Sequence, residues 1–213
     1  MKQVIMRVRQ LLWLFFVFFW LGIAIIIAWS SWRHFAPWEA PSIFLQDKQD
    51  AYFYFLPALY AHVFSSPMVL LLGSCCLWPA LRRYSIRLHQ WLGKAYVGLL
   101  LLLAAPSGFV MAFWALGGWA GQLCFVILSL LWMGVTWLAW KAAIGGNYAQ
   151  HRVWMWRSFA LTTAAFFLRF FSFLGAYFWH WRGPDVYIGL AWASWLFPLL
   201  VVELFLQVSK RLG

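Results

Sequence analysis

His89 and His151 are the residues whose type and placement best suit cofactor chemistry. Each stands at the start of a long apolar segment, in "RLHQWLGKAYV" and "QHRVWMWRSFAL", with arginines nearby. Haem b inside a helical bundle requires two imidazoles at one depth, apolar walls and basic groups for its propionates. The pair therefore predicts axial ligands of haem iron, with Tyr96 and Arg157 beside the cofactor. The alternative is that both histidines are interfacial residues and that the arginines only fix the topology.

His62 and Arg169 indicate a second site. His62 lies between Pro57 and Pro67, about ten residues inside an apolar segment and so roughly 15 Å deep. An ionisable residue at that depth is costly and commonly functional. Arg169 lies in the outer half of another apolar segment, where no acidic residue is available, so hydroxyls, carbonyls, water or a quinone head group would have to satisfy it. The alternative for His62 is simple packing against the adjacent serines.

Glu203 raises the possibility of a metal other than haem iron. A zinc site would combine Glu203 with His89 and His151, but no short-spaced pair of ligands supports it. The favoured interpretation of Glu203 is a salt bridge to Arg157 or to another arginine on the predicted cytoplasmic side. The chain also has no glycine-rich phosphate loop and no nucleophile elbow, and "GGWAG" at residues 117–121 predicts a tight turn.

The composition identifies the elements that must position these residues. Of the 213 residues, 65% are hydrophobic and only 10% are charged, against about 25% in soluble domains, so the chain is a polytopic membrane protein. Its net charge of +11 is typical of basic loops in membrane proteins, and we expect no nucleic-acid partner. Cys75, Cys76 and Cys124 lie in apolar segments without metal or redox spacing, which predicts small core residues and no disulfide.

Six apolar segments have about the 20 residues needed to cross a bilayer. The first follows basic residues, as in a signal peptide, but its apolar run is too long and lacks a small-x-small cleavage site, so we expect it to be retained. The chain is therefore predicted to be all-α, a single bundle of six transmembrane helices over residues 1–213. The predicted helices are about 11–29, 52–81, 88–114, 122–140, 153–179 and 186–208.

The distribution of the basic residues predicts how the protein is oriented in the membrane. They gather in alternate connections, and the positive-inside rule makes those connections, and both termini, cytoplasmic. Four of the five acidic residues fall on the other side, together with a long loop over residues 30–51 that we expect to lie at the membrane interface. The basic residues on the predicted cytoplasmic side are Lys2, Arg7, Arg9, Arg82, Arg83, Arg87, Lys141, Arg152, Arg157, Lys210 and Arg211.

Helical spacing predicts which faces point inward. Along one continuous helix, five turns from His151 return to Arg169, and Ser158 and Thr162 lie between them on the same face. Lipid offers polar groups no hydrogen-bond partner, so this face should point into the bundle. The third predicted helix has a similar face, made by His89, Gly93, Tyr96, Leu100, Leu103 and Ser107.

Four stretches of the sequence, in order, resemble a bacterial family of membrane proteins, domain of unknown function 2306. They are "AHVFSSPMVLLLG", "ALRRYSIRLHQWLGKAYV", "SGFVMAFWALGG" and "QHRVWMWRSFALTTAAFFLRF", within about residues 55–175. The family pattern has a histidine in its first core helix, an HR-x-x-G-R-x-Y block, and an H-x-x-W-M-x-R-x-x-A-L block ending in a membrane arginine. The resemblance implies a shared site and a place in the bacterial cytoplasmic (inner) membrane, and it names no reaction.

The family pattern can be followed residue by residue in this chain. Gln90 and Lys94 stand where the family has arginines, so an anionic partner at that loop would lose bidentate contacts. The positions that match are His62 in the first helix; His89, Gly93 and Tyr96 in the second block; and His151, Trp154, Met155, Arg157, Ala160, Leu161 and Arg169 in the third.

The third and fifth predicted helices are also distantly similar to di-haem membrane cytochromes of the b561 and ferric-reductase kind, whose ligands come from helices two apart. The fourth predicted helix has no histidine to pair with His62. One haem b, or a quinone near His62 and Arg169, is therefore the most that fits. We expect a redox-associated protein whose partner is a quinone or a respiratory-chain membrane protein. The alternative is a non-enzymatic membrane assembly factor or a transporter of a small solute.

Overall fold

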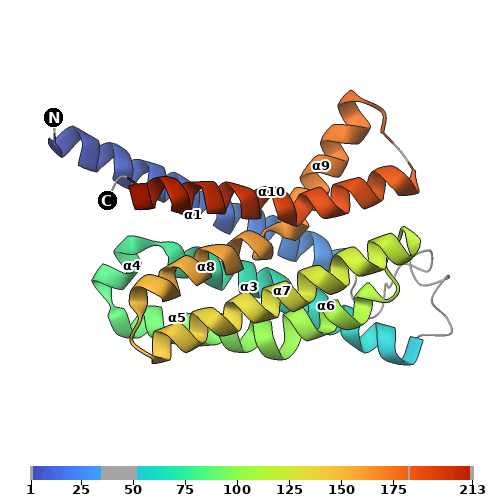
Figure 1. Cartoon of the computed structure of the whole chain (residues 1–213), viewed down its shortest axis with the longest axis horizontal. Coiled ribbons are helices and arrows are strands. Elements are labelled where there is room, and N and C mark those ends of the chain that lie inside the picture. The colour runs from blue at the N-terminus through green and yellow to red at the C-terminus, as the bar shows by residue number, and fades with distance from the viewer. Residues whose placement is uncertain (1, 35–51, 182, 212–213) are drawn as a thin grey trace.

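A computed structural model describes residues 2–34, 52–181 and 183–211 of the chain. All regular structure in these residues is helical, which confirms the predicted all-α fold (Figure 1). The helices are α1 (Lys2–His34), α3 (Tyr52–Leu77), α4 (Pro79–Tyr84), α5 (Ile86–Leu99), the π-helix η2 (Leu100–Ala104), α6 (Ala105–Ala112), α7 (Gly118–Ile144), α8 (Tyr148–Thr162), α9 (Ala164–Phe178) and α10 (Pro184–Arg211).

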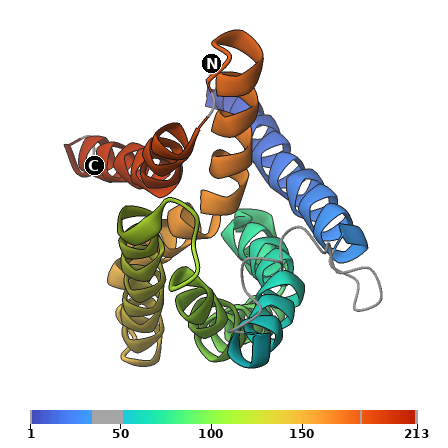
Figure 2. The ribbon, with the colours of Figure 1, turned by 90° about the vertical axis from the view of Figure 1, so that its right-hand side faces the viewer.

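Four helical segments form the centre of the molecule: α3, the run α5–η2–α6, α7 and α8 (Figure 1). Helix α1 packs along α3, and α10 packs on α8 and α9. Figure 2 shows α9 rising out of the bundle between α1 and α10. Tyr96, Leu100 and Trp132 lie in the core, where Ala104 and Ala139 are fully buried. Small residues of this kind let membrane helices approach closely, which dispersion forces then stabilise.

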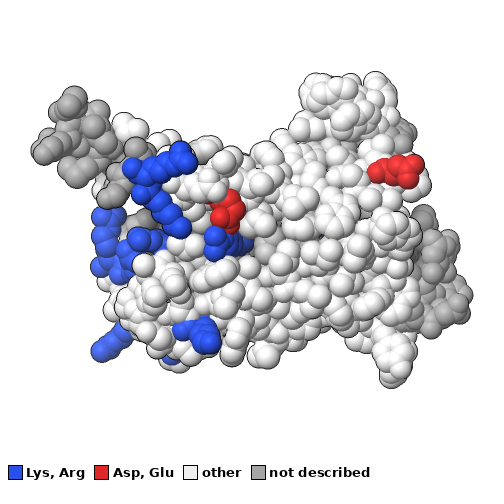
Figure 3. All heavy atoms as spheres, viewed as in Figure 1, with Lys and Arg blue, Asp and Glu red and all other residues white. Residues whose placement is uncertain are grey.

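The helices are suited to crossing a membrane. In the described part of the chain, five helical segments are long and apolar enough, with α5, η2 and α6 taken as one, and up to six spans result when the bent pair α8 and α9 counts as one. Helix α1 begins and α10 ends at the same end of the bundle (Figure 1). Exposed basic residues gather at this end, called the basic end below, while Asp185 lies at the other (Figure 3). The basic end carries Arg82, Arg83, Arg87, Lys141, Arg152, Lys210 and Arg211.

The second predicted helix, over residues 52–81, is divided in the structure. Helix α3 ends at Leu77, and Trp78 has extended backbone with φ −73° and ψ 114°. A residue before proline avoids the α region because the proline ring clashes with its backbone. Pro79 then begins the short helix α4, where its missing N–H costs nothing.

The third predicted helix contains one wide turn. At Leu100–Ala104 it widens into η2, where the Ala105 N–H bonds to the Leu100 carbonyl. Pro106 follows in the first turn of α6 and has no N–H to continue the regular ladder. Single π-turns inside helices occur frequently at functional sites. This one lies against His62, which bonds to the Ala104 carbonyl.

The fifth predicted helix, over residues 153–179, breaks at Thr163 into α8 and α9, which are bent by 42°. The Thr162 hydroxyl donates to the Ser158 carbonyl at 2.9 Å, and the Thr163 hydroxyl donates to the Ala160 carbonyl at 2.7 Å. Threonines that bond back to the preceding turn bend a helix because their hydroxyls compete for its carbonyls. The prediction of one continuous helix is therefore wrong, although Thr162 and Arg169, both on the predicted inward face, line one cavity.

The turn and the loop predicted between the helices can be compared with the structure only in part. Gly117 and Gly118 have φ of 90° and 61°, but α7 begins at Gly118, so the tight turn predicted at residues 117–121 is confirmed only at its start. The predicted loop over residues 30–51 lies mostly outside the described residues, and its first residues belong to α1. The three cysteines are free, and Cys124 is buried, as expected for core residues.

Candidate functional site

A cavity of about 270 Å³ lies among α3, α6, α7, α9 and α10. Phe55, Trp114, Phe125 and Trp132 give it aromatic walls. No aspartate or glutamate is among the described residues that line it. The polar lining consists of His62, Ser66, Ser129, Thr162, Arg169, Tyr187 and Ser194. The structure thus places His62 and Arg169, predicted from separate segments, around one space.

His62 is held by two hydrogen bonds. Its Nδ1 lies 2.8 Å from the Ala104 carbonyl oxygen on η2, and its Nε2 lies 3.2 Å from the Ser66 hydroxyl one turn along α3. Ser107 lies 3.5 Å from Nδ1 and also donates to the Ala104 carbonyl. The serine packing that was the alternative for His62 is present, and the ring lines the cavity as well.

Gly108 makes room for the His62 ring. A Cβ at this position would lie 3.1 Å from Cε1 and 3.2 Å from Nδ1 of the imidazole. Those separations are shorter than ordinary van der Waals contact, so any side chain would push the ring away from the Ala104 carbonyl. The π-turn and the glycine together fix the position of the imidazole.

Arg169 faces the cavity from α9. Its side chain is exposed, and Nη1 donates to the Ala165 carbonyl at 3.0 Å. Within the described residues this is its one hydrogen bond, and Tyr187 lies close enough to interact electrostatically. A guanidinium has five N–H donors in a fixed fork. Most of them are therefore available to a ligand or to water.

A buried network of hydroxyls lies beside the cavity. The Tyr96 hydroxyl is 2.7 Å from that of Ser158 and 2.9 Å from that of Thr162. Thr136 lies 2.6 Å from Ser158, and the Trp132 indole donates to Thr162 at 3.0 Å. Because Trp132 and Thr162 also line the cavity, the network connects its wall to the bundle core. The predicted inward faces of Tyr96, Ser158 and Thr162 are confirmed.

His89 and His151 lie toward the basic end and are not among the residues that line the cavity. They lie close enough to interact electrostatically. The His151 Nδ1 is 2.9 Å from the Ala139 carbonyl oxygen. The His89 Nδ1 is buried and has no hydrogen-bond partner in the part of the chain that the structure describes. The two predicted pairs of site residues therefore form two separate places in the bundle.

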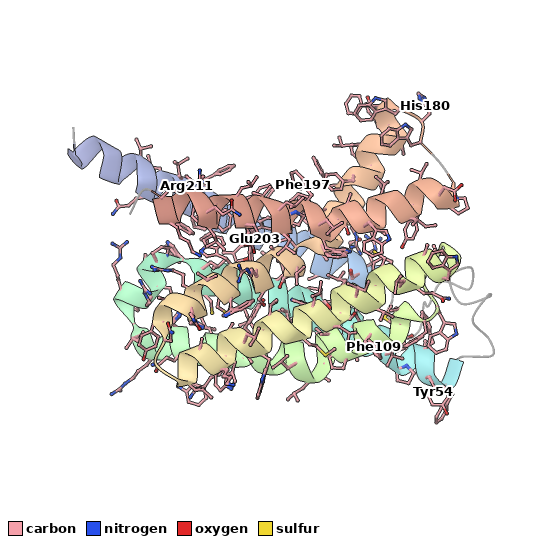
Figure 4. All side chains as sticks on the ribbon, in the orientation of Figure 1. Tyr54, Phe109, His180, Phe197, Glu203 and Arg211 are labelled. Carbon is pink, nitrogen blue, oxygen red and sulfur yellow. The ribbon has the colours of Figure 1, made fainter. Side chains whose placement is uncertain are left out.

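Glu203 and Arg157 form the ion pair that the sequence favoured. Nη2 of Arg157 donates to Oε2 of Glu203 at 3.0 Å, and Nε donates to Oε1, so the contact is bidentate. The guanidinium also lies 4.5 Å from the centre of the Trp154 ring. Figure 4 shows Glu203 between α10 and α8. The zinc alternative is wrong for the described residues, since no three metal-ligating side chains meet there.

A protein-family model matches the greater part of the chain. The model of the family described as "Predicted membrane protein (DUF2306)" matches residues 59–206. The chain belongs to this family. No curated protein and no solved structure matches the chain. The DUF2306 match includes His62, His89, His151 and Arg169, and its description names a membrane protein without an activity.

Several site residues of this DUF2306 protein were not found from the sequence. Trp132, Thr136 and Ser129 come from α7, whose polar residues are isolated and form no motif. Tyr187 and Ser194 come from α10, which packs on the bundle mainly through α7, α8 and α9. The available signal was weak: a hydroxyl in an apolar membrane helix requires a partner.

Proposed function

We propose that this membrane protein is redox-associated and binds a quinone head group in the cavity between His62 and Arg169. The observation that carries the proposal is the cavity itself, which combines these two polar groups with aromatic walls. At about 30 Å³ per water molecule, 270 Å³ has room for roughly nine waters, which suits a single substituted ring.

The chemistry of the lining supports a ligand rich in hydrogen-bond acceptors. Arg169 offers several N–H donors, and no carboxylate of the described residues in the cavity neutralises it. A quinone oxygen accepts such donors without bringing a full charge into the membrane. Phe55 and Trp114, which lie at 6.0 Å between centroids and 74° between planes, offer both a ring edge and a ring face.

The test measures the binding of a short-chain ubiquinone to the purified protein in lipid nanodiscs by isothermal titration calorimetry. We expect saturable binding that Arg169→Leu weakens by about 30-fold, because leucine has none of the N–H donors that the guanidinium offers to the cavity. Arg152→Leu, at the basic end, is the matched control and should bind as the wild type does. Absence of saturable binding would favour the assembly factor or small-solute transporter instead.

A second candidate is haem b between His89 and His151. Metal-bound histidines generally direct the other ring nitrogen to a carbonyl, and the His151 Nδ1 makes such a contact with Ala139. The unpaired His89 Nδ1 and the nearby Arg82 also suit a bound cofactor with acidic substituents. Haem would supply one-electron exchange. The two imidazoles would hold its iron, and Arg82 would bind a propionate.

An absorption spectrum of protein purified from haem-replete cells tests this candidate. We expect a Soret band that shifts on reduction and is lost in His89→Ala and in His151→Ala. His180→Ala is the control, because His180 lies at the tip of α9, away from the bundle (Figure 4). A colourless wild-type protein rules the haem candidate out and leaves the quinone proposal standing.

We also propose how the protein is oriented and in which membrane it lies. The basic end is cytoplasmic, both termini lie there, and the membrane is the bacterial cytoplasmic membrane, where a respiratory-chain membrane protein is the partner. A membrane-impermeant thiol reagent applied to intact cells should label Asp185→Cys and spare Arg83→Cys. Labelling of both positions from one side would contradict the orientation.

A further inference from the structure

We infer that the cavity binds the reduced form of its ligand, a hydroquinone, in preference to the quinone. One ligand hydroxyl donates to the wall made by His62 and Ser66, and the other ligand oxygen accepts from Arg169. This inference rests on the proposed function and specifies which redox form the site recognises.

The tautomer of His62 follows from its partner. A carbonyl oxygen only accepts hydrogen bonds, so the Nδ1 that lies 2.8 Å from the Ala104 oxygen must carry the proton. In the neutral ring Nε2 is then an acceptor. The Ser66 hydroxyl, 3.2 Å away, donates to it. Gly108 and the π-turn hold the ring in this arrangement, so it cannot turn over without losing the Ala104 bond.

Protonation of His62 on both nitrogens is disfavoured by its surroundings. No carboxylate is present among the described residues that line the cavity, and Arg169 already places one positive charge there. A second cation without a counter-ion, inside a membrane helix, costs several kcal/mol. His62 is therefore neutral, and the wall that it forms with Ser66 accepts a hydroxyl proton, either at Nε2 or at the serine oxygen.

On the opposite side of the cavity, Arg169 offers only hydrogen-bond donors. Arg169 uses one N–H on the Ala165 carbonyl, and its remaining N–H groups can only donate. A ligand that bridges the two walls therefore needs a donor at one end and an acceptor at the other. A hydroquinone has both, because each hydroxyl donates and accepts.

A quinone forms favourable hydrogen bonds with Arg169 but not with His62 and Ser66. Its two carbonyl oxygens both accept, so the oxygen beside His62 faces a lone pair of Nε2. It could take the Ser66 hydroxyl only by depriving His62 of that hydrogen bond. Ser129 lies on the same side with a hydroxyl that can adapt to either form, so the discrimination between the two forms depends on His62.

The experiment compares four probes on the wild-type protein in nanodiscs under argon. They are a short-chain ubiquinone, its hydroquinone, and the monomethyl and dimethyl ethers of that hydroquinone. We expect the hydroquinone to bind about fivefold or more tightly than the quinone, the range of one hydrogen bond. The monomethyl ether should bind like the hydroquinone, and the dimethyl ether, which has no donor, should bind no better than the quinone.

A protein variant assigns the preference to His62. His62→Phe removes the acceptor and keeps a ring of similar size, so the hydroquinone should lose its advantage and bind like the quinone. The ether series needs no mutant and still decides the question if this variant does not fold. Equal binding of quinone and hydroquinone would overturn the inference and leave the quinone site intact, whereas no binding of any probe would overturn both.

Discussion

Arg157 and Arg169 lie in the same predicted membrane segment, on opposite sides of the break at Thr163, and they differ in how their charge is satisfied. Arg157 makes a bidentate contact with Glu203 and lies over the Trp154 ring. Arg169 bonds to a carbonyl of its own helix and otherwise faces the cavity. The first arginine joins α8 to α10, and the second leaves its donors available.

The difference separates a structural arginine from a binding arginine. A charge paired with a carboxylate inside a helical bundle contributes to stability, since removing one partner leaves the other unpaired. A charge without a carboxylate partner destabilises the protein until water or a ligand satisfies it. Substitutions at the two positions should therefore change different measurements, and four predictions follow this difference from the largest effect to the smallest.

Arg157→Leu should lower the free energy of unfolding by about 3 kcal/mol, because it leaves the Glu203 carboxylate unpaired beside α8. Chemical denaturation of the purified protein in detergent micelles measures this change. The double variant Arg157→Leu/Glu203→Leu should recover most of the loss, since no charge is then left without a partner. A single variant as stable as the wild type would show that the pair contributes nothing.

Arg169→Leu should weaken quinone binding by about 30-fold, the loss expected for one hydrogen bond from a charged donor. Its stability should stay equal to or above that of the wild type, because an uncompensated charge is removed. Arg169→Lys should recover part of the affinity, as it keeps the charge and loses the planar fork. Calorimetric titration measures the quinone affinity of these variants, and a melting curve measures their stability. A large loss of stability with unchanged binding would show that Arg169 has a structural role and does not bind the ligand.

Tyr96→Phe should lower the free energy of unfolding by about 1 to 2 kcal/mol, since its buried hydroxyl bonds to both Ser158 and Thr162. The network joins the core to the cavity wall, so this variant tests whether the cavity depends on the core. We expect quinone affinity to change by less than about twofold, as Tyr96 does not line the cavity. Denaturation and titration on one preparation measure both quantities.

Gly108→Ala should weaken hydroquinone binding by about threefold with little change in melting temperature. The added methyl group would lie 3.1 Å from the His62 ring and displace it from the Ala104 carbonyl. Gly98→Ala is the matched control, because a Cβ at Gly98 has no atom within 4 Å outside its own helix. Equal effects of the two substitutions would mean that the position of the ring is unimportant.

A few residues show which side-chain positions could be predicted from the sequence. Tyr96, Ser158 and Thr162 were placed on inward faces by helical spacing, which holds within one unbroken helix. Arg169 was placed on the same face as Thr162 by this spacing, and both line the cavity although the helix breaks at Thr163 between them. Arg157 and Glu203 were paired correctly because few opposite charges were available in the membrane segments.

Composition and hydropathy were sufficient to predict the class of the protein, the approximate positions of its apolar helices, and the residues that are too costly to leave without partners in a membrane. They were sufficient because hydropathy, helical spacing and charge act locally along the chain. The three-dimensional packing of the helices was needed to show that His62 and Arg169 share a cavity while His89 and His151 lie elsewhere. That grouping depends on a π-turn, on a bend between two helices and on the packing of α10 against α7, α8 and α9, which together bring segments far apart in the sequence to one space.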